Sequence, residues 1–305
     1  MEERFNRNCL ALGHEGQMRL KDLDVAIVGV GGHGYNLSLM LVHLGVGSIK
    51  LIDDDSIDES NLNRLIGLKR SDVEKKKVKI LAKYIRKINP KIKVKAISYK
   101  ADHPEALSDL KNSSLIVGTV DSENGRLILN SISVQYLIPF IDLGCGIEAS
   151  NNGVIKSAGG QIRFVIPGVT PCLICIDGIN LQRAHQETLA PSELQGEIER
   201  GYVQGFNLPQ PSIVSLNMTI CSMACTQILF FATGLKETDF YLYYDLLNQR
   251  LEKIEAKRSE DCIVCSSDGI LGRGDTIPIN LKKVSSGNNY PFAKRNQHGN
   301  PIQSS

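Results

Sequence analysis

Val25-Ala26-Ile27-Val28-Gly29-Val30-Gly31-Gly32-His33-Gly34 is the stretch that decides the fold of this chain. Its first four residues are apolar, as in a buried strand, and the residues after Gly34 are typical of a helix. A glycine-rich turn between them lets the backbone approach a phosphate, at a helix N-terminus that favours negative charge. Asp53 ends the next expected strand, where its carboxylate can accept a hydrogen bond from a ribose hydroxyl. The stretch therefore predicts an adenine nucleotide, either a redox dinucleotide or ATP.

Strand-like and helix-like runs alternate through the first half of the chain. The alternation predicts an α/β fold, with a Rossmann-like, doubly wound, mainly parallel sheet. Strands are expected at 25–30, 49–53, 93–98, 115–119 and 139–143, and helices at about 35–44, 73–88, 104–110 and 125–136. Two C-terminal antiparallel hairpins are also expected, at 154–166 around Gly159-Gly160 and at 240–255. The polar segment 167–212 between them is a long crossover loop, of a length that is usually functional or mobile.

Composition and charge limit the class of protein. The 305 residues are 42% hydrophobic and 22% charged, which is ordinary for a globular protein. A single domain is expected over 1–285, with a nucleotide-binding half at about 20–145, a second half at about 146–285 and a disordered tail at 286–305. The formal net charge of +2 gives no argument for a nucleic-acid or membrane partner, and none is expected.

Localisation is read from the N-terminus and from one apolar segment. The N-terminus is charged and lacks the apolar run of a signal peptide, so a cytoplasmic protein is expected. Residues 213–235 are mostly apolar but include serine, threonine, asparagine and glutamine. A buried core helix explains this segment better than a membrane span.

Two cations and one acid follow the glycine turn at informative places. Arg64 and Lys77 suit a triphosphate better than a dinucleotide, because the γ-phosphate adds charge to neutralise. The alternative for Lys77 is a solvated helix face, since Lys75, Lys76 and Lys79 surround it. Asp121 follows a strand at the carboxyl edge of the sheet, where a carboxylate can hold Mg²⁺ against ATP oxygens. Its alternative is the N-cap of the helix that begins near Glu123.

Four cysteines form two Cys-x-x-Cys pairs, Cys172 with Cys175 and Cys262 with Cys265. Four thiolates complete a closed tetrahedral zinc site, and such sites are structural. Unligated or redox-active cysteines are the alternative. Of the other cysteines, Cys145, Cys221 and Cys225 lie in apolar contexts and are expected in the core.

The ordered set of motifs resembles the ThiF/MoeB adenylyltransferases, bacterial relatives of the ubiquitin-activating enzymes. The resemblance covers residues 4–265 and is carried by Arg4-Phe5-Asn6-Arg7, the glycine turn, Gly45-Val46-Gly47, Asp53-x-Asp55, Ser60-Asn61-Leu62-x-Arg64, Lys77, Asn89-Pro90, Asp121 and the cysteine pairs. It implies adenylation by ATP·Mg²⁺ of the C-terminal carboxylate of a small ubiquitin-like or sulfur-carrier protein that ends in Gly-Gly. Pyrophosphate is released, and a conjugating enzyme or sulfur donor would act downstream.

The resemblance also implies roles for single residues. Nucleotide binding falls to Gly29, Gly31, Gly32, Gly34, Asp53 at the ribose, Asp55, and Asn61, Arg64 and Lys77 at the phosphates. Asp121 would handle magnesium, and the cysteine pairs would hold structural zinc. Arg7 would reach the nucleotide of the neighbouring subunit, which implies a homodimer.

Three features depart from the family pattern, and two other functions stay open. His33 stands where an apolar residue is usual, Leu65 follows Arg64 where glutamine is common, and residues 176–212 contain no cysteine to form an enzyme thioester. A catalytically inactive nucleotide-binding scaffold of the same fold is one alternative. An NAD-dependent oxidoreductase is the other, but it leaves Arg64, Lys77 and Asp121 unexplained as a set.

Overall fold

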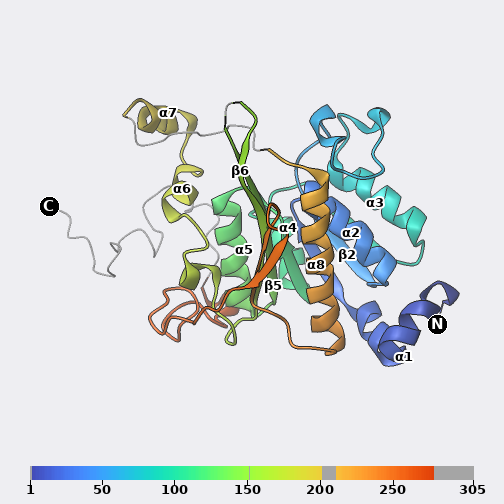
Figure 1. Cartoon of the computed structure of the whole chain (residues 1–305). Helices are drawn as coiled ribbons and strands as arrows, with labels where there is room; N and C mark the ends of the chain where they lie inside the picture. The colour runs from blue at the N-terminus through green and yellow to red at the C-terminus, as the bar shows by residue number, and fades with distance from the viewer. Residues whose placement is uncertain (1, 151, 201–210, 278–305) are drawn as a thin grey trace.

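The computed structural model describes residues 2–150, 152–200 and 211–277. One sheet runs through them, with strand order β3-β2-β1-β4-β5-β6-β7-β8 (Figure 1). The strands are β1 Asp24–Val28, β2 Ser48–Ile52, β3 Lys93–Ile97, β4 Leu115–Gly118, β5 Phe140–Ala149, β6 Ile155–Val165, β7 Tyr241–Asp245 and β8 Arg250–Lys253. β1 to β5 pair in parallel, and β5 to β8 pair antiparallel. The mixed α/β sheet with C-terminal antiparallel strands is therefore confirmed.

Helices cover both faces of the sheet because successive strand residues point to opposite sides. Val25 and Ile27 of β1 pack into one core, and Ala26 and Val28 pack into the other. The helices of the first face are α1 Asn6–Asp22, α2 Gly32–Leu44, α3 Lys77–Ile88 and α8 Val214–Thr233. On the second face lie α4 Pro104–Lys111, α5 Glu123–Tyr136 and α6 Leu181–Gln186, while α7 Pro191–Glu199 lies farther out (Figure 1).

The strand order has a switch point between β1 and β4, the place where a crevice forms in doubly wound folds. From β1 the chain proceeds to β2 on one side, and from β4 it proceeds to β5 on the other. Ligands of doubly wound folds bind at such a point, beyond the carboxyl ends of the strands. The glycine turn follows β1 and Asp121 follows β4, so the topology brings both to this crevice.

The Gly159-Gly160 hairpin predicted from the sequence is wrong. β6 runs straight through both glycines and pairs with β5, and the turn lies instead near Gly153, whose φ is +79°. A Cβ on Gly159 would lie 2.7 Å from the Tyr244 carbonyl oxygen, and one on Gly160 would lie 2.5 Å from Ile220. These glycines allow close packing rather than a turn.

Two helices also differ from expectation. α3 begins at Lys77 rather than at Val73, because Glu74 has φ +69° and Lys76 forms a β-bridge with Ser56. α1 was not predicted, because its apolar residues show no clear helical periodicity. It is kinked at Gly13, where φ is +71°.

α8 is the apolar segment that raised the question of a membrane span. It is long and apolar enough to cross a membrane, the one such helix among the described residues, and 39% of its 18-residue apolar window is buried. Leu216, Ile220, Ala224 and Ile228 pack into the core against α2 and β6, so one face of the helix is a core face. The expected core helix is therefore found on this face, while the remaining residues of α8 are partly exposed.

Candidate nucleotide site and cysteine cluster

The glycine turn is held closed by contacts that leave no room for side chains. Gly29 has φ +86°, a conformation that favours glycine. A Cβ on Gly34 would lie 1.9 Å from the Gly29 carbonyl oxygen. The Thr119 hydroxyl, just beyond β4, donates to the same oxygen at 2.5 Å. The turn is thus fixed to the neighbouring strand at the crevice.

The N-terminus of α2 opens beside this turn. Gly31 is its N-cap, and a Cβ there would meet nothing within 4 Å. A Cβ on Gly32 would lie 2.5 Å from the Asn217 amide nitrogen and 3.3 Å from Cδ of Arg64. Free backbone N–H groups with open space in front form an anion site. Asn217 and Arg64 border that space.

Asp53 is held at the end of β2 by backbone donors. Its Oδ2 accepts from Val30 N–H at 2.6 Å and its Oδ1 from Asp55 N–H at 2.8 Å. Burial raises the pKa of Asp53, and the nearby Lys77 charge and the two N–H donors partly oppose this. Each oxygen keeps a lone pair, so the carboxylate can still accept from a ribose hydroxyl.

Lys77 is buried, whereas its neighbours Lys75 and Lys79 are exposed. Its ammonium lies 2.7 Å from Oδ2 of Asp55, whose side chain is largely exposed. The solvated-face interpretation of Lys77 is therefore wrong. A buried cation with one exposed acidic partner is available to an anionic ligand.

Arg64 reaches the same neighbourhood from the segment between β2 and α3. Its Nη1 donates to the Ser60 carbonyl at 2.7 Å and to Oδ1 of Asn63 at 3.0 Å. The pKa of exposed Asp58 is lowered first by hydrogen bonds from Ser60 and further by the charges of Arg64 and Lys77. Both cations thus lie within electrostatic range of one carboxylate.

Asn36 of α2 ties this segment to the glycine turn. Its side-chain nitrogen donates to the Gly32 and Arg64 carbonyls, both at 2.7 Å, and its oxygen accepts from Ile66 N–H at 3.2 Å. Asn61 is buried in the same segment, where its oxygen accepts from the backbone of Asp58 at 3.2 Å. Asn36 and Asn217 were missed from the sequence. The signal available was an amide within a mostly apolar helix.

Asp121 is exposed at the carboxyl edge, two residues after Thr119. The N-cap alternative for Asp121 is wrong, because Ser122 caps α5 by accepting from Gly125 N–H at 3.1 Å. Asp121 therefore lies at the edge of the crevice without a capping role.

Arg7 lies far from the glycine turn of its own chain. It is exposed on α1, and its neighbour Asn8 donates to the Leu44 carbonyl at the C-terminal end of α2. The 13 residues of α2 span about 20 Å. Figure 1 shows α1 at the lower right and the segment between β2 and α3 at the upper right. The structure does not bring Arg7 to this site.

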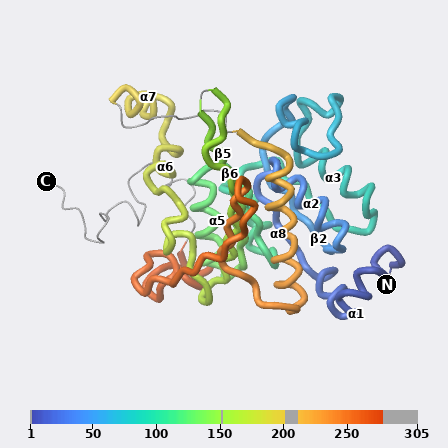
Figure 2. Tube along the Cα trace, viewed as in Figure 1, coloured from blue at the N-terminus to red at the C-terminus, as the bar shows by residue number. Residues whose placement is uncertain are grey.

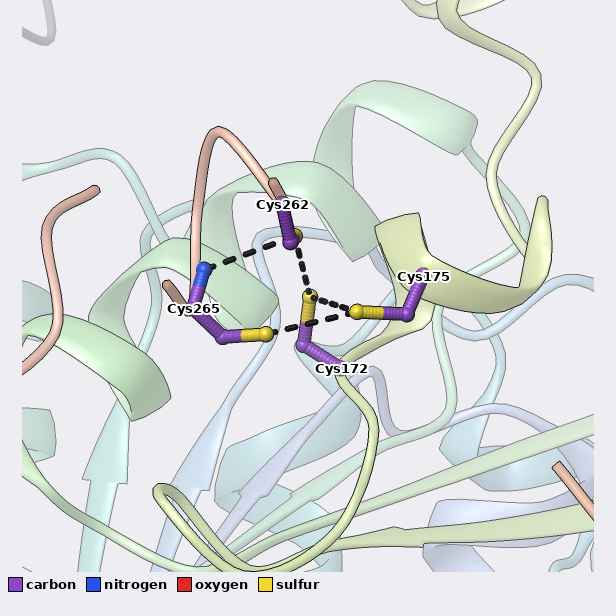
Figure 3. A group of neighbouring side chains, drawn as sticks. All are labelled: Cys172, Cys175, Cys262 and Cys265. Carbon is purple, nitrogen blue, oxygen red and sulfur yellow. Dashed lines mark hydrogen bonds between the residues drawn. The ribbon is translucent and has the colours of Figure 1, made fainter. Parts of the chain in front are cut away.

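The start of the crossover segment, yellow-green in Figure 2, lies beside the orange-red C-terminal segment. The four paired cysteines converge from these two segments. Their sulfurs all lie within 4.8 Å of one another (Figure 3). Cys172 lies 3.7 Å from Cys262 and 3.9 Å from Cys175, and Cys175 lies 3.3 Å from Cys265. A tetrahedron with Zn–S bonds of about 2.3 Å has S–S edges of about 3.8 Å. The spacing therefore fits a zinc ion.

Arg163 of β6, which forms a buried ion pair with Asp142 of β5, also ties the crossover segment to the sheet. Arg163 donates through Nε to Oδ2 of Asp142 at 3.0 Å and through Nη1 to the Gly178 carbonyl at 3.0 Å. The Glu123 carboxylate accepts from Asn180 N–H at 2.9 Å. These contacts position the start of the crossover loop over the carboxyl edge.

Comparison with known proteins identifies the family. The ThiF family model matches residues 5–264. The chain belongs to the ThiF family. This confirms the resemblance found in the sequence.

Named relatives of this ThiF-family chain include activating enzymes. The sulfur carrier protein ThiS adenylyltransferase of Bacillus subtilis is 32% identical over 203 residues, covering 64% of this chain and 57% of the relative. The match thus spans little more than half of that relative. The SAMP-activating enzyme E1 of Haloferax volcanii is 25% identical over 270 residues, covering 88% of this chain and 90% of the relative. E. coli MccB with ATP has a TM-score of 0.69 at 21% identity, over 87% of this chain and 75% of that chain, and shows the shared fold.

Proposed function

We propose that this ThiF-family chain uses ATP·Mg²⁺ to adenylate the C-terminal carboxylate of a small ubiquitin-like or sulfur-carrier protein, with release of pyrophosphate. One observation carries the proposal most strongly. The buried Lys77 ammonium and the Arg64 guanidinium lie near the open N-terminus of α2. The named relatives are adenylyltransferases and activating enzymes, which supports the same activity.

The chemistry needs charge neutralisation rather than a general base. A C-terminal carboxylate is already ionised at pH 7, so it can attack the α-phosphate directly. Asp53 would bind the ribose, and the α2 N-terminus with Arg64 and Lys77 would bind the phosphates. Such fixed positive groups stabilise the charge that develops during phosphoryl transfer. Asp121 supplies the kind of oxygen ligand that Mg²⁺ prefers.

The remaining roles are proposals of the same kind. Zinc bound by the four cysteines would hold the crossover segment to the C-terminal segment. In a homodimer, Arg7 would contact the nucleotide bound to the partner subunit, since Arg7 is remote from the nucleotide site of its own chain. An apolar pocket of about 440 Å³ between α1, α2 and α8, lined in part by Met40 and Met218, supports a second copy on that face. We place the protein in the cytoplasm, where its eight cysteines would stay reduced.

ATP–pyrophosphate exchange tests the proposal. Purified protein is mixed with candidate Gly-Gly proteins, and exchange is expected only with the correct partner. Lys77→Ala or Arg64→Ala should lower exchange by ~10²-fold or more, the scale of a lost transition-state charge contact. Lys79→Ala, an exposed neighbour on the same helix, is the matched control and should retain exchange. Normal exchange in both Lys77→Ala and Arg64→Ala would contradict the proposal, and ATP binding without exchange would favour the inactive scaffold.

A further inference from the structure

The positive charge of this chain is concentrated in one short segment. Residues 69–100 contain 13 lysines and arginines and two acidic residues, which gives the segment a net charge of +11. Because the whole chain has a net charge of +2, all the other residues together carry −9. The near-neutral total therefore conceals a strongly polarised molecule, and the total alone does not exclude a nucleic-acid partner.

The segment forms one edge of the sheet and the helix that packs on it. It contains α3 and β3, and β3 is the terminal strand of the described sheet, with β2 as its neighbour. Nη2 of Arg86, near the end of α3, donates to the Val94 carbonyl of β3 at 3.0 Å and so ties the helix to the strand. The charges therefore gather along one side of the molecule, where α3 lies at the right of Figure 1. We call residues 69–100 the basic edge.

Lysines line the solvent-facing side of α3, because the apolar face of this helix packs into the core. Lys79, Lys83 and Lys87 are exposed at intervals of four residues, which places them along one helix face in steps of about 6 Å. None of the three has an acidic partner among the described residues, and the Lys87 ammonium lies over the Tyr84 ring. This row of charge is therefore available to an external anion.

Protection of the sheet edge explains only part of this charge. Lysines on an edge strand hinder pairing with another chain, and Lys93 and Lys95 of β3 are placed for that role. Lys95 is also neutralised by Asp109 of α4, at 2.6 Å. The lysines of α3 lie instead on a helix, whose backbone groups are already paired within the helix. They need another explanation.

The composition of the basic edge favours a polyanion over a protein or a membrane. Eleven of its 13 cations are lysines, whereas protein–protein interfaces are depleted in lysine and enriched in arginine and aromatic residues. A helix that lies on a membrane needs outward apolar side chains, but those of α3 face the core. Lysine ammonium groups bind phosphates as point charges and do not require a particular base sequence.

One aromatic side chain lies at the end of the basic edge. Tyr99 follows β3, is 41% exposed and stacks on His103, with ring centroids 3.7 Å apart. It is the one large hydrophobic residue exposed within residues 69–100, and Lys100 beside it is exposed as well. Proteins that bind single-stranded nucleic acid combine backbone-binding cations with exposed rings on which bases stack.

We propose that the basic edge binds single-stranded RNA, with Lys79, Lys83 and Lys87 at backbone phosphates and Tyr99 stacked on a base. Unpaired loops and ends are the parts of RNA whose bases are free to stack in this way. The proposal is independent of the proposed adenylation. Lys77, which we assign to ATP, is buried at the start of α3 and does not belong to the exposed row.

Fluorescence anisotropy with the full chain tests the phosphate contacts. The probe is a labelled single-stranded RNA of about 16 nucleotides without self-complementarity. The test variant is Lys79→Gln/Lys83→Gln/Lys87→Gln. Each phosphate contact contributes about 0.7 to the slope of log affinity against log salt, so the slope should become shallower by about 2 between about 50 and 200 mM salt. At the low-salt end the variant should bind ~10²-fold more weakly than wild type.

Two further variants separate the position of the charge from its amount. Lys156→Gln/Lys236→Gln/Lys257→Gln removes the same charge from exposed sites outside the basic edge and should keep the wild-type slope. Tyr99→Ala should weaken binding ~10-fold at an unchanged slope, because stacking on a base releases no counterion.

Several results would overturn the proposal. They are no RNA binding by the wild-type chain at low salt, equal losses in the two triple variants, a duplex bound as tightly as the single strand, and binding to anionic vesicles but not to RNA. All six lysines are exposed, so both triple variants should keep the wild-type Tm. ATP binding should be unchanged in both, so failure of RNA binding would leave the proposed adenylation standing, and the reverse also holds.

Discussion

Removing the cysteine cluster offers a quantitative test of the zinc proposal. The ion would join positions 172 and 175 to 262 and 265 and so close a loop of just under 90 residues. In the chain-entropy model, a cross-link of that length stabilises the folded state by about 4–5 kcal/mol. For a domain of this size the loss corresponds to a Tm lower by roughly 10–15 °C. Cys262→Ser, or a strong chelator, should produce this fall.

The assay for this prediction is thermal unfolding followed by circular dichroism, with zinc measured by mass spectrometry. We expect about one Zn²⁺ per chain, which is the stoichiometry of a closed four-thiolate site. Cys225→Ser is the control, because Cys225 lies outside the cluster. Nucleotide binding at the glycine turn should survive in Cys262→Ser at temperatures below its Tm. A metal-free wild-type protein with an unchanged Tm would refute the reasoning.

Three further predictions concern the turn, a thiol and a buried ion pair. Gly31→Ala should keep Tm within ~2 °C, because the added Cβ contacts no other atom, but it should weaken ATP binding measured by calorimetry. Gly34→Ala should unfold at a clearly lower temperature, because the added Cβ overlaps the Gly29 carbonyl oxygen. Equal effects of the two substitutions would be the contrary result. Since the pKa of Cys145 is raised to about 12, the free enzyme at pH 8 should alkylate there ~10³-fold more slowly than a peptide cysteine, with a rate that still rises at pH 10. An alkylation rate that levels off near pH 9 would contradict the raised pKa of Cys145. Arg163→Leu should cost up to about 3–5 kcal/mol in denaturant unfolding, because it removes the nearer of two guanidinium partners of the buried Asp142 carboxylate and leaves Arg126 at 3.4 Å. A cost below 1 kcal/mol would be inconsistent with that burial.

The sequence predicted the parallel half of the fold well, since strongly apolar runs and a glycine turn have few structural alternatives. The prediction failed at the expected hairpin, because glycine occurs both in turns and at places where chain segments pack closely. Gly159 and Gly160 are typical of a turn, but the structure uses them for close packing against β7 and α8. A packing role depends on residues such as Tyr244 and Ile220, which are distant in sequence, so no local pattern could show it.

The candidate site was also predictable only in part. The residue types and positions of Asp53, Arg64 and the paired cysteines were enough to predict roles for them, and those roles stay predictions. The burial of Lys77 did not follow from its lysine-rich neighbours, because it depends on the turn at Glu74 and the bridge to Ser56. Contacts of that kind are tertiary and could not be predicted from local sequence.

A structure with magnesium and the ATP analogue AMPCPP tests the central claim most directly. We expect the Arg64 and Lys77 nitrogens within ~3 Å of phosphate oxygens, a usual charge-assisted hydrogen-bond distance, and the Asp121 carboxylate beside the magnesium ion. A bound nucleotide with these three side chains directed away from it would contradict the account.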